Sequence, residues 1–300
     1  MSSTHIQNLA VLNNSELRSL LLQYRRENWQ DIQTPEWQEK IVDSIVEDDG
    51  EAVLRDVTRF WKIPSQCSVL DIGSGVGTFV IACRRRGLQA FGIEPDRIGQ
   101  GTTLSSVQIA RRRIKERVFA VAVGESLPFP NCSFDLIVMN QVMEHVADQT
   151  AVLDEAVRVL KPGGAIYIAC PNYFRFYEPH YKIFWLPLLP KLLGRFYLRF
   201  RGRSPVLLDQ LSYTTNFRLR QLFQRFKADC KVIDLHQEQF LSKYTKGSFA
   251  SGRGQFVAKL GQLRAIGGLI RWVALQYLHI VEGGCEMLIL RSPISANHVC

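Results

Sequence analysis

The sequence predicts an α/β fold: a doubly wound, seven-stranded, mostly parallel sheet with helical additions at the N- and C-terminal ends. Two observations lead to this prediction. Short apolar runs alternate with amphipathic, charged stretches between residues 65 and 172, which is typical of parallel strands covered by helices on both faces. The chain has 300 residues, 46% hydrophobic and 22% charged, so it can bury a sizeable core and is not a disordered polymer.

Residues 1–64 are expected to form a helical N-terminal cap. Ser15 can cap a helix over 16–29, and Thr34 precedes a proline at the first position of a second helix. A third helix is expected from about 51 to 61.

Residues 65–172 are expected to form the ligand-binding core, in which strands alternate with helices. The predicted strands are 68–72, 89–93, 118–123, 134–139 and 165–170. The predicted helices are 78–86, 99–116 and 148–160. Because parallel strands connect through right-handed crossovers, these units wind over both faces of one sheet.

Residues 173–300 are expected to hold a substrate lid, the sixth and seventh strands and a helical insertion. A helix over 214–226, capped by Thr214 or Thr215, precedes the sixth strand, and the last two strands are predicted at 231–235 and 286–291. An apolar helical pattern over 255–281 is interrupted by two glycines, which predicts two helices there.

The charge of the chain is concentrated at its C-terminal end. The formal net charge is +9, yet residues 173–300 alone hold 19 Lys and Arg against seven Asp and Glu. This asymmetry predicts an anionic partner or, alternatively, a solvated basic face.

The seven cysteines are scattered without disulfide or metal-ligand spacing, so free thiols and no metal site are predicted. The N-terminus has no signal-peptide pattern and no apolar run reaches the roughly 18 residues of a membrane span. We therefore expect a cytoplasmic protein.

The strongest local motif is a buried strand that ends in an acid and opens into a glycine turn before a helix. It reads Val69-Leu70-Asp71-Ile72-Gly73-Ser74-Gly75-Val76-Gly77. Glycines let a ligand approach the backbone, and the helix N-terminus offers free N–H groups. A tight turn without a ligand is the alternative interpretation.

A second motif places Glu94 and Pro95 at the end of the second strand. A carboxylate there can accept hydrogen bonds from both ribose hydroxyls of a nucleoside, since strand ends of such sheets form the ligand crevice. A solvated turn residue is the alternative.

Four segments then carry a resemblance to a known family. They are DIGSGVG (71–77), GIEPD (92–96), GESLPFPNCSFDLIVMNQVMEHV (124–146) and RVLKPGG (158–164). In this order they resemble a class I S-adenosylmethionine-dependent methyltransferase, and most of all the branch that includes the ubiquinone/menaquinone-biosynthesis enzymes. The resemblance covers about residues 65–172 and implies a Rossmann-like methyltransferase fold with S-adenosylmethionine as cofactor.

The resemblance also implies roles for individual residues, which remain expectations here. Asp71 and the glycine turn would frame the methionine half of the cofactor, and Glu94 would bind its ribose. The adenine would be bordered by Gly124, Glu125 and Ser126, although Val123 stands where many relatives carry Asp. The methyl-transfer site would be lined by Asn140 and Gln141.

His145 is the candidate catalytic residue, in a segment that follows the fourth strand. Its ordinary pKa of about 6.5 would let it act as a general base. The alternative is a histidine that only braces the turn, because in-line placement of the acceptor can supply much of the rate of methyl transfer.

The lid segment 179–203 is aromatic and basic, with five Lys and Arg between Lys191 and Arg203. This composition suits peripheral contact with an anionic membrane at its inner face, a phosphorylated substrate, or a packed lid with solvated arginines.

The sequence thus favours methyl transfer to a small-molecule or lipid-like acceptor, expected at oxygen. A nicotinamide-dependent oxidoreductase is the first alternative, disfavoured because Thr78 replaces the third glycine of the dinucleotide fingerprint. A non-catalytic cofactor-binding protein is the second. Nucleic acid is disfavoured as a substrate, because Asn140-Gln141-Val142-Met143 lacks an amino-methylation motif.

Overall fold

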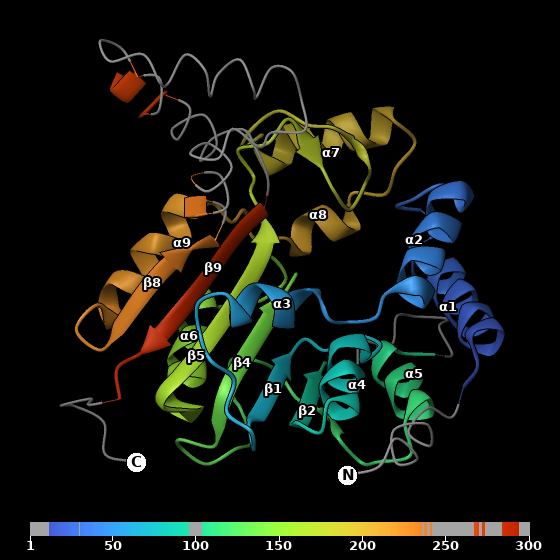
Figure 1. Ribbon diagram of the computed structural model, residues 1–300. Coiled ribbons are helices and arrows are strands. Elements are labelled where there is room, and N and C mark those ends of the chain that lie inside the picture. Colours follow the sequence, from blue (N-terminus) through green and yellow to red (C-terminus); the bar gives the residue numbers. More distant parts are fainter. Residues whose placement is uncertain are drawn as a thin grey trace.

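The computed structural model describes residues 12–29, 31–95, 104–235, 237–238, 241, 267–269, 272–273 and 284–293. Within this part of the chain, a seven-stranded sheet lies between two layers of helices (Figure 1). Its strand order is β3-β2-β1-β4-β5-β9-β8. Strands β1 to β5 pair in parallel, and β9 is antiparallel to both of its neighbours. The predicted doubly wound, mostly parallel sheet is confirmed.

All seven predicted strands are present. They are β1 (Ser68–Ile72), β2 (Gln89–Glu94), β3 (Phe119–Val121), β4 (Phe134–Asn140), β5 (Leu160–Pro171), β8 (Cys230–Asp234) and β9 (Gly284–Arg291). The largest difference from prediction is the start of β5, which begins five residues earlier than expected. Leu160 already pairs with Phe134 before an irregularity in the β4–β5 register, so the two glycines at 163 and 164 lie within the strand.

The helices of the core follow the prediction, except that the helix expected over 99–116 is shorter at both ends within the described residues. They are α4 (Thr78–Arg85), α5 (Ser106–Arg113), α6 (Gln149–Val159) and α9 (Asn216–Phe223), the last continued by a 3₁₀ turn, η1 (Gln224–Phe226). Thr215 caps α9, where its hydroxyl accepts a hydrogen bond from the Arg218 N–H at 3.1 Å.

The N-terminal cap consists of α1 (Asn14–Trp29), α2 (Pro35–Glu47) and α3 (Ala52–Thr58). The cap of α1 is Asn13 rather than the predicted Ser15. The Asn13 Oδ1 atom accepts a hydrogen bond from the Glu16 N–H at 3.0 Å, and the Asn13 N–H donates to the Glu16 carboxylate at 2.9 Å. Asparagine is as good a helix cap as serine, and it stands two positions earlier.

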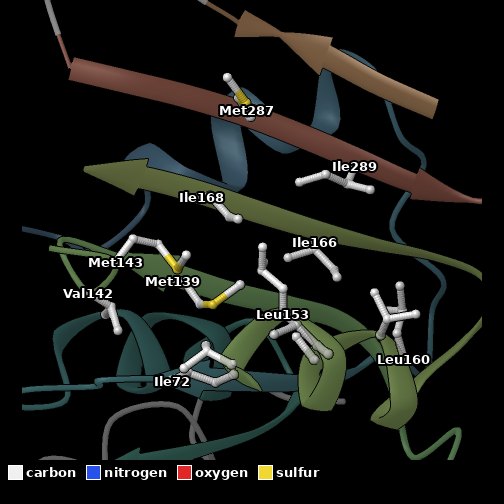
Figure 2. Packing of buried hydrophobic residues seen from close by; sticks show 14 of the residues in the cluster. Ile72, Met139, Val142, Met143, Leu153, Leu160, Ile166, Ile168, Met287 and Ile289 are labelled. Carbon is white, nitrogen blue, oxygen red and sulfur yellow. The ribbon is translucent and has the colours of Figure 1, made fainter. Parts of the chain in front are cut away.

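Alternate residues of each central strand pack on opposite faces of the sheet. Leu70, Ile137 and Ile166 pack against α6 and α9, whereas their neighbours Val69 and Leu136 pack against α3, α4 and α5. Figure 2 shows the first face, where buried side chains of β4, β5 and β9 meet α6. Burial on both faces explains why these strands are continuous apolar runs.

The C-terminal addition begins directly after β5. It contains the hairpin β6 (Tyr177–Glu178) and β7 (Ile183–Phe184), followed by α7 (Lys191–Phe200) and α8 (Val206–Gln210). These elements pack around Tyr181 and Trp185, at the edge of the sheet where the parallel strands end (Figure 1). The predicted helices over 255–281 lie almost entirely outside the described residues.

Five cysteines, at positions 67, 83, 170, 230 and 285, are free thiols as predicted. The prediction is wrong for Cys132, which is disulfide-bonded. None of the described helices is both long and apolar enough to cross a membrane.

Candidate functional site

The glycine turn joins β1 to α4 and is held against the end of β2. The Gly73 and Ser74 N–H groups both donate to the Ile93 carbonyl, at 2.8 and 2.9 Å. Gly75 and Gly77 have positive φ angles of +52° and +81°. A Cβ atom at Gly77 would lie 2.5 Å from the Phe119 ring, whereas at Gly75 it would meet no atom within 4 Å. Packing therefore requires glycine at 77, while the backbone at 75 is open to a ligand.

Glu94, the last residue of β2, lies beside this turn. One of its carboxylate oxygens accepts from the Gly75 N–H at 3.0 Å, and the other accepts from the Ser106 hydroxyl at 3.0 Å. These bonds fix the carboxylate, and each oxygen can accept a second hydrogen bond. Pro95 follows directly and ends the strand. The arrangement suits two hydroxyl donors of a ligand.

A cavity of about 240 Å³ opens in front of the turn. It is lined by Asp48, Gly50, Ala52, Val53, Asp71, Gly73, Ser74, Gly75, Val76, Thr78, Phe79 and Asn140. Five of these residues were predicted to touch the cofactor. The lining residues between 48 and 53 were missed, because no motif marks the connection between α2 and α3 as part of a site.

Asp71 brings a buried carboxyl group to this cavity. Its side chain is 4% exposed, and burial, with a smaller contribution from the negative charge of Glu94, raises its pKa well above the usual range. A carboxylate in such surroundings is stabilised by a cationic ligand group, since a nearby positive charge offsets the cost of desolvation.

The predicted adenine-binding segment does not line this cavity. Gly124 packs against Ile72 and Val152, and the Glu125 carboxylate accepts from the N–H groups of Ala147 and Asp148, at 2.9 and 3.4 Å. Ser126 is exposed. The Glu125 side chain thus joins this loop to the start of α6.

Asn140, the last residue of β4, and Gln141, which follows it, have different surroundings. Asn140 faces the cavity. Gln141 is exposed and has a φ of +59°, and its N–H donates to the Ala169 carbonyl at 2.6 Å. Gln141 therefore joins the ends of β4 and β5 through its backbone and does not line the cavity.

His145 contacts the β6–β7 hairpin rather than this cavity. Its Nε2 atom lies 3.2 Å from Nε2 of His180, and the rings meet edge to face with centroids 5.0 Å apart. His180 donates from Nδ1 to the fully buried Glu178 at 2.8 Å. Sequence reasoning missed His180 and Glu178, because nothing in their spacing indicates that residues 35 positions apart would meet.

Glu144, beside His145, is also fully buried. Neither of its carboxylate oxygens has a hydrogen-bond partner within the described part of the chain. Burial raises the pKa of Glu144 to about 7, with His180 lowering it and Glu178 raising it by smaller amounts. A buried carboxyl group whose nearest charged partner is His145, at 3.9 Å, was not expected from the sequence.

Helix α7 presents an exposed apolar surface with basic residues beside it. Its buried side, at Gly194 and Leu198, packs against Trp185 and Leu208. The exposed apolar residues, with their exposed fractions, are Leu192 (62%), Leu193 (54%), Phe196 (61%) and Phe200 (87%). Arg195 forms an ion pair with Asp209 at 2.8 Å, and Arg199 and Arg201 are exposed.

Comparison with known proteins identifies the family. Residues 45–233 match the family described as "Methyltransferase domain". An uncharacterized methyltransferase of Mycobacterium sp. strain KMS is 35% identical over 124 residues, 39% of this chain and 44% of that protein. A demethylmenaquinone methyltransferase of Tropheryma whipplei is 33% identical over 127 residues, 41% of this chain and 50% of that protein. The chain thus matches about half the length of these relatives.

Among solved structures, phosphoethanolamine N-methyltransferase 2 of Haemonchus contortus, in complex with phosphomonomethylethanolamine and S-adenosylhomocysteine, has the same fold. The TM-score is 0.50 at 17% identity, over 95% of this chain and 61% of that one. The family match spans more than half of the chain, and the strand order agrees with it. The chain therefore belongs to the methyltransferase-domain family, as a class I, S-adenosylmethionine-dependent member.

Proposed function

We propose that the protein transfers a methyl group from S-adenosylmethionine to an oxygen atom of a lipid-like acceptor at an anionic membrane surface. The cofactor half of this proposal depends on one observation above the others. Asp71, the open backbone of Gly75 and the carboxylate of Glu94 lie together at the ends of β1 and β2.

Two parts of the cofactor have a matching group. The Asp71 carboxylate is assigned to the positively charged methionine end, with Gly73, Ser74 and Gly77 shaping the turn around it. Glu94 is assigned to the ribose hydroxyls, because its two oxygens are already fixed by Gly75 and Ser106.

The remaining predicted contacts are proposed by position alone. Gly124, Glu125 and Ser126 would border the adenine, with backbone groups as partners since the Glu125 carboxylate is bonded to the start of α6. Asn140 would face the transferred methyl group. Gln141 would hold Asn140 in place through the hydrogen bond from its own N–H to the Ala169 carbonyl.

The acceptor class is inferred from α7. Four large apolar side chains exposed on one helix are costly in water and are stabilised at a lipid interface. The cations along and after this helix, including Arg199 and Arg201, would attract anionic headgroups at about 1 kcal/mol each. Helix α7 lies in the C-terminal addition, at the edge of the sheet where the parallel strands end (Figure 1). Asn140 of the cofactor cavity also lies at this edge, paired with Ala169 of β5, so a membrane-bound α7 would bring lipid toward the reaction site.

An oxygen acceptor is inferred from His145. A hydroxyl loses its proton when it is methylated, and His145 is the group beside the lid that we assign to removing that proton. This assignment concerns the acceptor alone, since cofactor binding would not need the imidazole.

The membrane part is tested by sedimentation with anionic and neutral liposomes at low salt. One variant changes the cations of the α7 region, Arg195, Arg199, Arg201 and Arg203, to Gln. The control changes Arg55, Arg59, Arg112 and Arg117 to Gln, which removes the same charge elsewhere. We expect the first variant alone to lose binding to anionic liposomes, and we expect salt to weaken wild-type binding.

Both variants should still bind S-adenosylmethionine, which verifies that they fold. Transfer of tritiated methyl groups into a polar lipid extract then tests the acceptor class. If the wild-type protein ignores anionic liposomes and labels no lipid, the lipid assignment is wrong and α7 is an ordinary substrate lid.

A further inference from the structure

We infer that Glu144, His145 and His180 form a binding site for a divalent first-row transition-metal ion such as Zn²⁺. One carboxylate oxygen and two imidazole nitrogens from these residues all lie within 4.8 Å of one another. Two imidazoles and a carboxylate are a typical donor set for such an ion, whereas Mg²⁺ prefers oxygen ligands alone.

The distances already approach those of a bound ion. Ligands about 2.0–2.1 Å from a tetrahedral zinc ion lie about 3.3 Å apart from each other. The two histidine Nε2 atoms are 3.2 Å apart, and the Glu144 oxygen lies 3.9 Å from Nε2 of His145. The Glu144 oxygen lies within 4.8 Å of the His180 nitrogen, so a shift of the Glu144 side chain by up to about 1.5 Å would complete the three-ligand geometry.

The state of Glu144 is an independent indication. Its side chain has no solvent exposure, and neither oxygen has a hydrogen-bond partner within the described residues. An isolated buried carboxylate is expensive, and buried charges are found paired or bound to metals. A cation between Glu144 and the two imidazoles would supply the missing partner.

His180 is held in the tautomer that metal binding needs. Its Nδ1–H donates to the buried Glu178 carboxylate at 2.8 Å, so the lone pair of Nε2 faces the cluster. Glu178 is itself fixed, because it accepts from the Tyr181 N–H at 2.6 Å. A carboxylate behind a metal-binding histidine is the usual arrangement, since it orients the ring and increases its basicity.

The ion would connect two segments that the fold brings together from different places. Glu144 and His145 follow β4, and His180 lies in the lid hairpin between β6 and β7. Three protein ligands leave a position for an oxygen ligand. A hydroxyl bound there would have a lowered pKa and would lose its proton to solvent, so in the ion-bound protein His145 would act as a ligand of the ion and not as the proton acceptor. This role rests on the proposed function, whereas ion binding does not.

The test starts from protein treated with a chelator and dialysed. Calorimetry with Zn²⁺ and visible absorption with Co²⁺ should give one ion per chain, and Mg²⁺ should give no heat. We expect His180→Ala and Glu144→Gln to weaken binding by about 100-fold or more, and Glu178→Gln by about 10- to 100-fold. Asp154→Asn, which changes an exposed carboxylate on α6, should bind like the wild type.

Calorimetry with S-adenosylmethionine on the same samples reports whether each variant is folded. The inference is overturned if the wild-type protein takes up no stoichiometric ion, or if folded His180→Ala and Glu144→Gln bind Zn²⁺ as the wild type does. A protein that binds the ion but not S-adenosylmethionine would instead contradict the proposed function and leave the metal site standing.

Discussion

Alanine substitutions at Gly75 and Gly77 should have opposite dominant effects, although the two positions are two residues apart. Both glycines have positive φ angles, so either substitution should cost about 1–2 kcal/mol in backbone strain. At Gly77 the added Cβ would also lie 2.5 Å from Phe119, and such overpacking adds about 1–3 kcal/mol. We expect a loss in unfolding free energy of about 1–2 kcal/mol for Gly75→Ala and about 2–5 kcal/mol for Gly77→Ala.

Cofactor binding should be weakened more by Gly75→Ala than by Gly77→Ala, the reverse of the order for stability. The Cβ at residue 75 projects into space that the structure leaves open, where we place the cofactor. Gly75→Ala should therefore weaken S-adenosylmethionine binding by at least about tenfold, about 1.4 kcal/mol. Urea unfolding and calorimetry on both variants measure the two quantities. Wild-type affinity in Gly75→Ala, or equal stability of the two variants, would refute the reasoning.

Three further predictions concern single side chains. Because burial raises the pKa of Asp71, the folded protein binds the proton of this carboxyl group more tightly than the unfolded chain does, and stability should fall as the pH rises above about 4. Asp71→Asn should remove this pH dependence in urea unfolding and should weaken cofactor binding. An unchanged pH profile would contradict the assignment. His145→Ala should lower label transfer into lipid by about 10²- to 10⁴-fold with cofactor affinity intact, and a loss below about threefold would favour placement alone. Phe200→Ser should weaken liposome binding by about tenfold or more, since burying a phenylalanine contributes about 1.5–3 kcal/mol, without lowering the melting temperature; unchanged sedimentation would exclude α7 as the contact.

The sheet could be predicted from the sequence because its strands are apolar on both faces. A run such as Ser68–Ile72, which is buried along almost its whole length, is typical of a strand in the middle of a sheet covered on both faces. Helix caps were harder to predict. The sequence predicted Ser15 as the cap of α1, whereas in the structure Asn13 is the cap. Several residues near a helix start can serve as caps, and the choice depends on where the chain enters the helix.

The sequence could predict the cofactor cavity but not the cluster of Glu144, His145 and His180. Asp71 and Glu94 lie near the carboxyl ends of neighbouring strands, so the parallel sheet itself brings them to one edge. His145 and His180 meet only because the β6–β7 hairpin folds back onto the loop after β4. That contact depends on tertiary packing around Tyr181 and Trp185, which no local pattern encodes. The prediction that the chain has no metal site relied on spacing alone, and the ion-binding measurements test it.

The central claim is that the protein binds S-adenosylmethionine with Glu94 at the ribose. Calorimetry tests it most directly, by titrating the wild-type protein and Glu94→Ala with S-adenosylmethionine and, separately, with NADH. The variant loses the acceptor that we assign to two ribose hydroxyls, which contributes about 2–4 kcal/mol. We therefore expect the wild type to bind S-adenosylmethionine and not NADH, and Glu94→Ala to bind S-adenosylmethionine about 30- to 700-fold more weakly. Binding of NADH in place of S-adenosylmethionine, or unchanged affinity in a folded Glu94→Ala variant, would contradict the account.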